Sequence, residues 1–116
     1  MAAPTWSSLT FAPWRFLARR DPRRELETLA RVFTALAHAS RRQILLVLQY
    51  HGGAMTAGEI ADRFACSWPT TTRHLRQLRD AGLVVVEKVG RERIYHLDAD
   101  RLRRVVGDWI EHFADA

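Results

Sequence analysis

The stretch Ser67–Val86, SWPTTTRHLRQLRDAGLVVV, decides the fold of this chain. Ser67 is a helix N-cap residue, because its hydroxyl can accept a backbone N–H, and Pro69 suits a first turn whose N–H groups have no intrahelical partners. Apolar residues then recur at helical spacing and predict one buried face: Leu75, Leu78 and Ala81. Gly82 ends the predicted helix, and the β-branched residues that follow it predict a strand.

The other face of this helix carries small hydroxyls and arginines. The outward positions are Trp68, Thr70, Thr72, Arg73 and Arg76. Such a face fits a DNA major groove, because hydroxyls reach phosphates or bases and arginine pairs with guanine. A basic helix face that is merely solvated is the alternative interpretation of the same residues.

A second short helix is expected immediately before Ser67. The sequence TAGE at residues 56–59 is a capping box, and its helix has an apolar face made of Ile60, Ala61 and Phe64. A tight turn at residues 65–66 joins the two helices. Two short helices linked by about three to four residues, the second with a basic face, predict a helix-turn-helix.

Two strand-like runs follow Gly82, at residues 83–88 and 92–97, and Gly90 supplies the turn between them. Three cations cluster near this turn: Lys88, Arg91 and Arg93. Because the hairpin directly follows a helix-turn-helix, we interpret it as a wing whose tip contacts phosphates beside the groove. An ordinary charged hairpin tip is the alternative.

Helices are also expected at both ends of this region. From Pro22, apolar residues follow helical spacing through Ala37. A second helix is predicted from Ser40, where SRRQ at residues 40–43 reads as a capping box, and residues 44–48 (ILLVL) place it at the centre of the core. The last helix is expected from about Asp98. The fold class is therefore mainly helical, with about five helices and a two-stranded wing.

The first and last predicted helices are more apolar than one small core requires. Pairing across a two-fold axis explains this surplus, because symmetric dimers dominate among oligomers and read two half-sites one DNA turn apart. The expected dimer contacts are Leu26, Leu29, Phe33, Leu102, Val106, Trp109 and Phe113.

Composition narrows the function further. The chain has 116 residues, with Lys+Arg 18 against Asp+Glu 13, and the net charge of +5 favours a polyanionic partner. The single cysteine, Cys66, excludes an internal disulfide and fits the cytoplasm. No apolar run approaches the ~18 residues of a membrane span. A glycine-rich phosphate loop, a spaced carboxylate pair and a nucleophile–base signature are all missing, so no enzyme is expected.

The chain divides at about residue 21. Residues 1–21 form an N-terminal arm that is both basic and aromatic, and residues 22–116 form the winged helix-turn-helix domain. Because such aromatic density is unusual for a disordered tail, we expect the arm to lie against the body or a second subunit. A floppy arm is the alternative.

The order of these elements resembles the ArsR/SmtB family of bacterial winged-helix repressors, over roughly residues 26–113. The resemblance is carried by LAHASRRQIL at 36–45, EIA at 59–61, TRHLRQL at 72–78, AGLV at 81–84 and GRERIYHL at 90–97. It implies a homodimeric repressor of a double-stranded DNA operator, with Trp68, Pro69, Thr72 and Arg73 at the groove-contacting positions. Trp68 and Pro69 depart from the small polar pair common there, so the base preference cannot be transferred.

Arginines outside the groove-contacting positions are expected to bind phosphates, which fix the register without carrying sequence information. The candidate DNA contacts are Arg41, Arg42, Ser67, Trp68, Pro69, Thr70, Thr72, Arg73, Arg76, Lys88, Arg91 and Arg93. Winged helices also serve as protein-interaction modules. Trp68 would then be an anchor for a protein partner, and this remains the alternative of another class.

The sensing sites of the family are mostly missing here. Thr56 and Gly58 stand where many members place cysteines, and Ala99 and Arg101 stand where others place an Asp and a His early in the last helix. The later pair of that site survives as His112 and Asp115. Because stable zinc needs three or four ligands, half a site predicts no metal and no cofactor.

Two responsive forms of the repressor remain as alternatives. One senses a metal through His112 with Asp115, and the other senses oxidants through Cys66, which adjoins the N-terminus of the recognition helix. Release by an unidentified small-molecule effector fits the sequence equally well.

Overall fold

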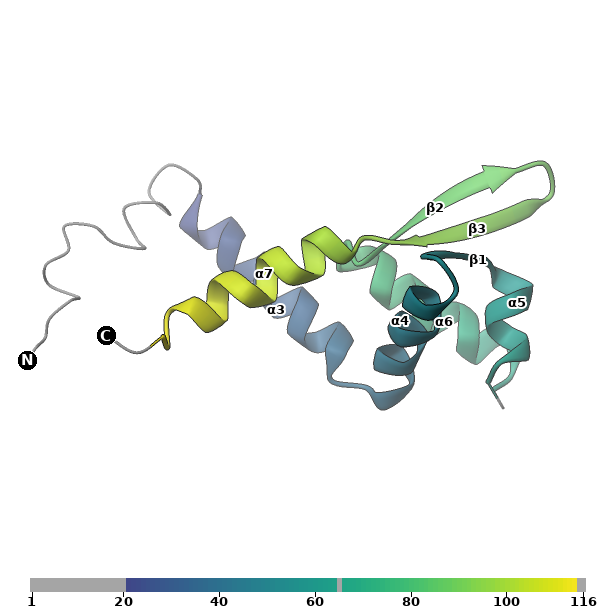
Figure 1. The fold of residues 1–116 in the computed structure, drawn as a ribbon, viewed down its shortest axis with the longest axis horizontal. Coiled ribbons are helices and arrows are strands. Elements are labelled where there is room, and N and C mark those ends of the chain that lie inside the picture. The colour runs from purple at the N-terminus through teal and green to yellow at the C-terminus, as the bar shows by residue number, and fades with distance from the viewer. Residues whose placement is uncertain (1–20, 65, 115–116) are drawn as a thin grey trace, which may run out of the picture.

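The computed structural model describes residues 21–64 and 66–114. The predicted N-terminal arm therefore lies outside the described residues, apart from Asp21. The elements are α3 (Pro22–Leu36), α4 (Ala39–Tyr50), β1 (Ala54–Thr56), α5 (Ala57–Asp62), α6 (Trp68–Asp80), β2 (Val84–Val89), β3 (Glu92–Leu97) and α7 (Ala99–Glu111). The predicted fold class, mainly helical with a hairpin wing, is confirmed. Figure 1 shows α3 and α7 side by side, with the β2–β3 hairpin projecting from the other end of the body.

The starts of the first two described helices differ in how well the sequence predicted them. Helix α3 begins at Pro22 as expected, because the Asp21 side chain accepts from the backbone N–H of Arg23. The capping box predicted at Ser40 is wrong. Helix α4 begins at Ala39, and its N-cap is His38, whose Nδ1 accepts from the Ser40 backbone N–H at 3.2 Å. The imidazole nitrogen thus takes the role predicted for the serine hydroxyl.

The wing belongs to a larger sheet than the sequence predicted. The short strand β1 pairs antiparallel with β3, so the sheet has three strands in the order β1-β3-β2. Gly52 and Gly53 have φ values of 80° and 91°, which allow the sharp turn from α4 into β1. The sequence predicted only the two strands of the hairpin, so β1 was not expected.

The core forms where the helices meet the base of the wing. Its innermost side chains come from α3 to α6 and the start of the wing: Val32, Ile44, Leu48, Ile60, Leu75, Leu78, Leu83 and Val84. The central place predicted for residues 44–48 is confirmed by the buried Ile44, Leu45 and Leu48. Helix α6 packs against α3, α4, α5 and β2, so its inward face is held by four elements. Among the described residues, no helix is long and apolar enough to cross a membrane.

Candidate nucleic-acid interface

The first helix of the helix-turn-helix is fixed by the capping box that the sequence predicted. Thr56 Oγ1 accepts from the Glu59 backbone N–H at 3.1 Å, and Glu59 Oε1 accepts from the Thr56 backbone N–H at 2.8 Å. The bond from the Thr56 backbone N–H favours the charged carboxylate and, together with the Thr56 side chain, lowers the pKa of Glu59. Helix α5 is only six residues long, so this cap orders a large part of it.

Helix α6 also begins as predicted. The Ser67 hydroxyl oxygen accepts from the Thr70 backbone N–H at 3.3 Å and donates to the Thr70 hydroxyl at 3.0 Å. Pro69 occupies the first turn. Ser67 and Thr70, both candidate DNA contacts, therefore have capping roles within the chain. Their hydroxyls stand at the N-terminus of α6, where the positive end of the helix dipole favours an anion such as a phosphate.

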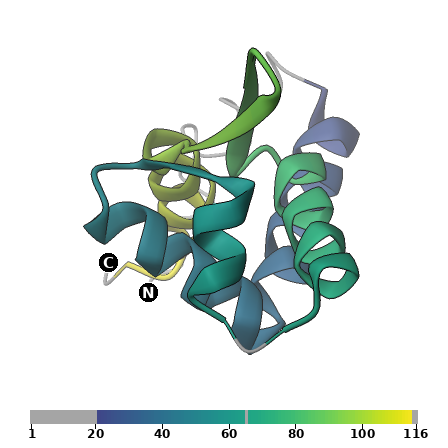
Figure 2. The same ribbon diagram turned by 90° about the vertical axis from the view of Figure 1, so that its right-hand side faces the viewer.

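The two faces of α6 separate clearly. Thr71, His74, Leu75 and Leu78 are buried. The exposed candidates on the other face are Trp68, Pro69, Thr72, Arg73 and Arg76. In Figure 2 the wing projects beyond the helical body, and α6 lies along one side of that body. The structure therefore brings the predicted groove contacts together on one accessible helix surface.

Trp68 is the largest exposed side chain of this surface, with 56% of its area accessible. Its ring lies close to Gly58 of the preceding helix α5. A Cβ atom added to Gly58 would be 4.0 Å from Trp68 Cη2. The ring therefore lies beside α5, and more than half of its area stays exposed. Trp68 can therefore present an aromatic surface to a sugar, a thymine methyl group or a protein partner.

The wing tip gathers its cations on a tight hairpin. Gly90 adopts a φ of 62°, which the turn requires, and Arg91 follows it. Lys88 and Arg93 are exposed and directly opposite each other in the strand register. Like charges in this arrangement destabilise a hairpin. A phosphate placed between them would relieve the repulsion, so the tip is suited to contact a DNA backbone.

Arg41 and Arg42 have partners inside the chain. Arg41 Nε donates to the Ala35 carbonyl at 2.8 Å, and its Nη2 donates to the Thr34 carbonyl at 3.1 Å. Arg42 Nη1 donates to the Leu36 carbonyl at 2.6 Å. Both arginines thus cap the C-terminus of α3, where unpaired carbonyls favour cations. Their predicted phosphate contacts would compete with these bonds.

The buried side of α6 contains one titratable group, His74, whose ring centroid lies 4.5 Å from that of His38. Burial lowers the pKa of His74, and the neighbouring imidazole of His38 and the positive charges of Arg41 and Arg73 lower it further. The neutral imidazole is therefore the form that the core accepts.

The candidate dimer residues occupy the paired helices α3 and α7, except Phe113, which lies in the turn after α7. Phe33 and Trp109 contact edge to face with ring centroids 5.0 Å apart, and Trp109 contacts Phe113 in the same way at 5.0 Å. None of the residues of α7, all of which the structure describes, is buried. Leu26 and Phe113 remain 67% and 68% exposed. Leu29, Leu102 and Val106 are half-buried. The helix pair thus keeps an uncovered apolar face.

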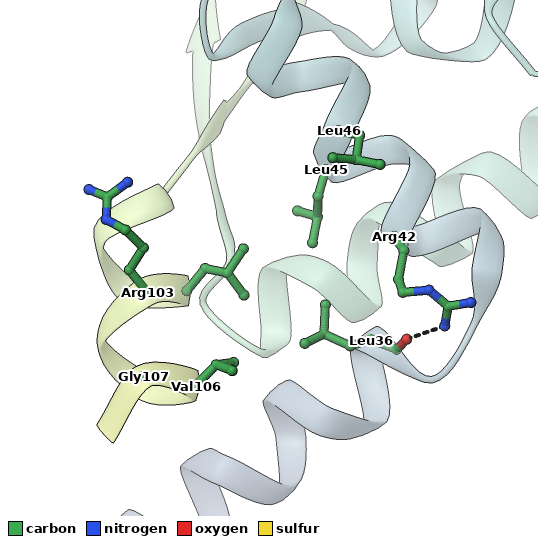
Figure 3. Close-up of a pocket in the computed structure, with 8 residues that line it drawn as sticks. Leu36, Arg42, Leu45, Leu46, Arg103, Val106 and Gly107 are labelled. Carbon is green, nitrogen blue, oxygen red and sulfur yellow. Dashed lines mark hydrogen bonds between the residues drawn. The ribbon is translucent and has the colours of Figure 1, made fainter. Parts of the chain in front are cut away.

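A shallow groove of about 680 Å³ opens beside this helix pair, between the end of α3, α4 and α7. Figure 3 shows Leu36, Leu45 and Val106 lining it and the bond from Arg42 to the Leu36 carbonyl at its side. The groove could not be predicted from the sequence, because its lining comes from three separate elements.

The residues considered for metal or thiol sensing do not converge. Within residues 21–64 and 66–114, no three His, Cys, Asp or Glu side chains gather as a metal site. His112 is exposed, with its Nδ1 3.0 Å from the Asp108 carbonyl oxygen, and Asp115 lies outside the described residues. Cys66 is a free, half-buried thiol. Arg101, at a position where the family's metal site would need a ligand, donates instead to the Ala81 carbonyl.

Comparison with known proteins agrees with this architecture. A family model described as a helix-turn-helix domain matches residues 36–87. The transcriptional repressor SdpR of Bacillus subtilis is 35% identical over 82 residues, which cover 71% of this chain and 88% of SdpR. The crystal structure of the ArsR family transcriptional regulator RHA00566 superposes with a TM-score of 0.67 at 30% identity, covering 74% of this chain and 86% of that one.

A second solved structure is similar over nearly the same region. It is the homodimeric winged helix-turn-helix DNA-binding domain Mb0332 of Mycobacterium bovis, with a TM-score of 0.60 at 29% identity, covering 78% of this chain and 84% of that one. The relatives are transcriptional regulators, not enzymes. The resemblance seen in the sequence is therefore confirmed, and the chain belongs to the ArsR/SmtB family of winged helix-turn-helix DNA-binding transcriptional repressors.

Proposed function

We propose that this protein is a homodimeric repressor that binds an inverted-repeat operator in the cytoplasm and needs no metal to do so. Each subunit inserts α6 into the major groove and rests its wing tip on the flanking phosphates. The observation that carries this proposal is the exposed face of α6, on which Trp68, Thr72 and Arg73 stand free while the opposite face is buried in the core.

The DNA contacts divide into two classes. Thr72 and Arg73, in the first half of α6, are the base readers, because the N-terminal part of a recognition helix enters the groove first. Arg76 lies one turn further along the helix and, with Lys88, Arg91 and Arg93 of the wing, contacts phosphates. Phosphate contacts supply affinity and register, whereas base contacts supply sequence preference.

The apolar face of α3 and α7 supports the dimer. Leu26, Ile110 and Phe113 each leave more than half of their area in water in the single chain. Full burial of a side chain of this size contributes about 1.5–3 kcal/mol, so covering the exposed half or more would contribute roughly 1–2 kcal/mol, and a symmetric interface would gain each contribution twice. The similar Mb0332 domain is a homodimer. A two-fold axis through this face would place two copies of α6 on successive turns of the same DNA side.

The experiment is selection of genomic fragments by the full chain at physiological salt, repeated with zinc and with a thiol oxidant. An enriched inverted repeat whose binding is the same under all three conditions supports the proposal. Loss of binding with zinc would assign a metal-responsive repressor and direct attention to His112 and Asp115. Loss with the oxidant, abolished in Cys66→Ser, would assign a thiol-responsive one. The absence of any enriched sequence would overturn the repressor and favour the protein-interaction module.

A further inference from the structure

Arg101 joins the helix α7 to the end of the recognition helix. Its Nε donates to the carbonyl of Ala81, the C-cap residue of α6, at 3.1 Å. The same guanidinium covers Gly82, because a Cβ added there would lie 2.3 Å from Arg101 Nε and 2.7 Å from Cζ. The close approach requires the absence of a side chain at Gly82, which also has a φ of 77°.

Further bonds make this junction rigid. Asp98, the N-cap of α7, accepts from the Arg101 backbone N–H at 3.0 Å and donates its own backbone N–H to the Leu83 carbonyl at 2.9 Å. The Leu83 backbone N–H in turn donates to the Leu78 carbonyl inside α6 at 3.0 Å. The end of α6 and the start of α7 therefore form one hydrogen-bonded unit, although 20 positions separate Ala81 from Arg101.

The neighbouring arginines of α7 do not share this geometry. Arg103 pairs with Asp100 within its own helix, and Arg104 is exposed. Arg101 is half-buried and places its positive charge at the C-terminal end of α6, where the helix dipole favours a cation. The contact is therefore a specific link between two helices, and Arg104 offers a matched arginine without it.

We propose that Arg101 is a positioning residue that fixes the angle between α6 and α7 and thereby determines which half-site spacing the dimer accepts. This inference rests on the proposed dimer, in which α7 lies at the two-fold axis and α6 reaches the DNA. Helix α6 has 13 residues and is therefore ~20 Å long. A tilt of ~10° at its anchored C-terminal end moves its N-terminal end by ~3.5 Å, about the rise of one base pair.

The test measures binding of the full chain to its selected inverted repeat and to versions with one or two base pairs added or removed between the half-sites. The wild type is expected to prefer one spacing by about tenfold or more, since a misplaced helix loses contacts worth at least one mismatched base pair. Arg101→Ala is expected to reduce this preference to about threefold or less, whereas Arg104→Ala keeps it. The salt dependence should be unchanged in Arg101→Ala, because Arg101 is not assigned a phosphate.

Arg101→Lys provides the second variant if Arg101→Ala does not fold. It keeps the positive charge but lacks the planar guanidinium that covers Gly82, so it should also broaden the accepted spacings. An unchanged preference in a folded Arg101 variant overturns the inference. A wild type that shows no preference for an inverted repeat instead overturns the proposed function, so the two failures are distinguishable.

Discussion

Arg41 Nη1 lies 3.4 Å from Nδ1 of His74, so a cation of α4 faces the buried side of the recognition helix. His74 is only 7% exposed, and its ring also contacts that of His38. Protonating His74 would place a second positive charge in this poorly solvated space. The packing beneath α6 therefore accommodates only a neutral imidazole at His74. The proximity of Arg41 to His74 makes the stability of the fold sensitive to pH.

The first prediction concerns that sensitivity. Because burial and its cationic neighbours hold the pKa of His74 below the ordinary 6.5, the unfolded chain binds more protons than the folded one as the pH falls below that value. The free energy of unfolding therefore contains the full contribution of His74 above pH 6.5, where His74 is neutral in both states. It falls progressively below that pH, because the unfolded chain gains a proton at His74 more readily. Urea unfolding at about pH 7.5 and about pH 5.5 should show a drop that is smaller in His74→Gln. The exposed His112→Gln controls for the change from histidine to glutamine itself, and a drop in His74→Gln equal to that of the wild type would contradict the assignment.

A second prediction distinguishes an arginine that stabilises the fold, Arg41, from one that we assign to DNA binding, Arg76. Arg41→Ala removes charged hydrogen bonds to the Ala35 and Thr34 carbonyls and should lower the free energy of unfolding by about 1–3 kcal/mol. The exposed Arg76→Ala should change it by no more than about 0.5 kcal/mol. Denaturant titration of both variants measures the difference. Equal stability of the two would show that the capping bonds of Arg41 contribute little.

The third prediction concerns base reading by Arg73. If its guanidinium reads a guanine, Arg73→Ala should weaken operator binding by about 1–3 kcal/mol and relax the preference at one base pair. Arg76→Ala should weaken binding to all sequences alike and reduce the salt slope by about one. Binding to a set of single-base operator variants at several salt concentrations separates these outcomes. A uniform loss in Arg73→Ala would reassign Arg73 to a phosphate.

The fourth prediction tests the apolar face of α3 and α7, which Phe113 extends just past the end of α7. Phe113→Glu places a charge in the proposed interface, so it should convert the dimer to a monomer and reduce operator affinity, because one half-site alone supplies only half of the contacts. Tyr50→Glu is the control, since Tyr50 is 81% exposed on α4 and has no assigned partner surface. Sedimentation analysis and operator binding should agree. A dimeric Phe113→Glu with wild-type affinity would move the interface elsewhere.

Local sequence patterns predicted the helix-turn-helix well. The Thr56–Glu59 capping box, the Ser67 cap and the Gly82 stop each depend on residues close in sequence, and all three are observed. The periodicity of α6 correctly placed Leu75 and Leu78 in the core for the same reason, but it missed the buried Thr71 and His74, whose polar side chains give no apolar signal. Short-range chemistry was enough to define the surface that we assign to DNA.

Contacts between elements that are distant in the sequence could not be predicted from these local patterns. Strand β1 has three residues and exists because β3 offers it hydrogen bonds, so its own sequence contains little signal. The bonds of Arg41 to α3 and of Arg101 to Ala81 likewise depend on how helices pack. The sequence identified these arginines as cations, but only the fold shows that both serve helix ends.

The most direct test of the central claim is a comparison of affinities at physiological salt. The full chain is titrated against its selected inverted repeat and against a scrambled duplex of the same length and composition. We predict a specificity ratio above ~10³, with two chains bound to each repeat. A ratio near one would contradict the account, because binding would then arise from the basic charge of the surface rather than from reading by α6.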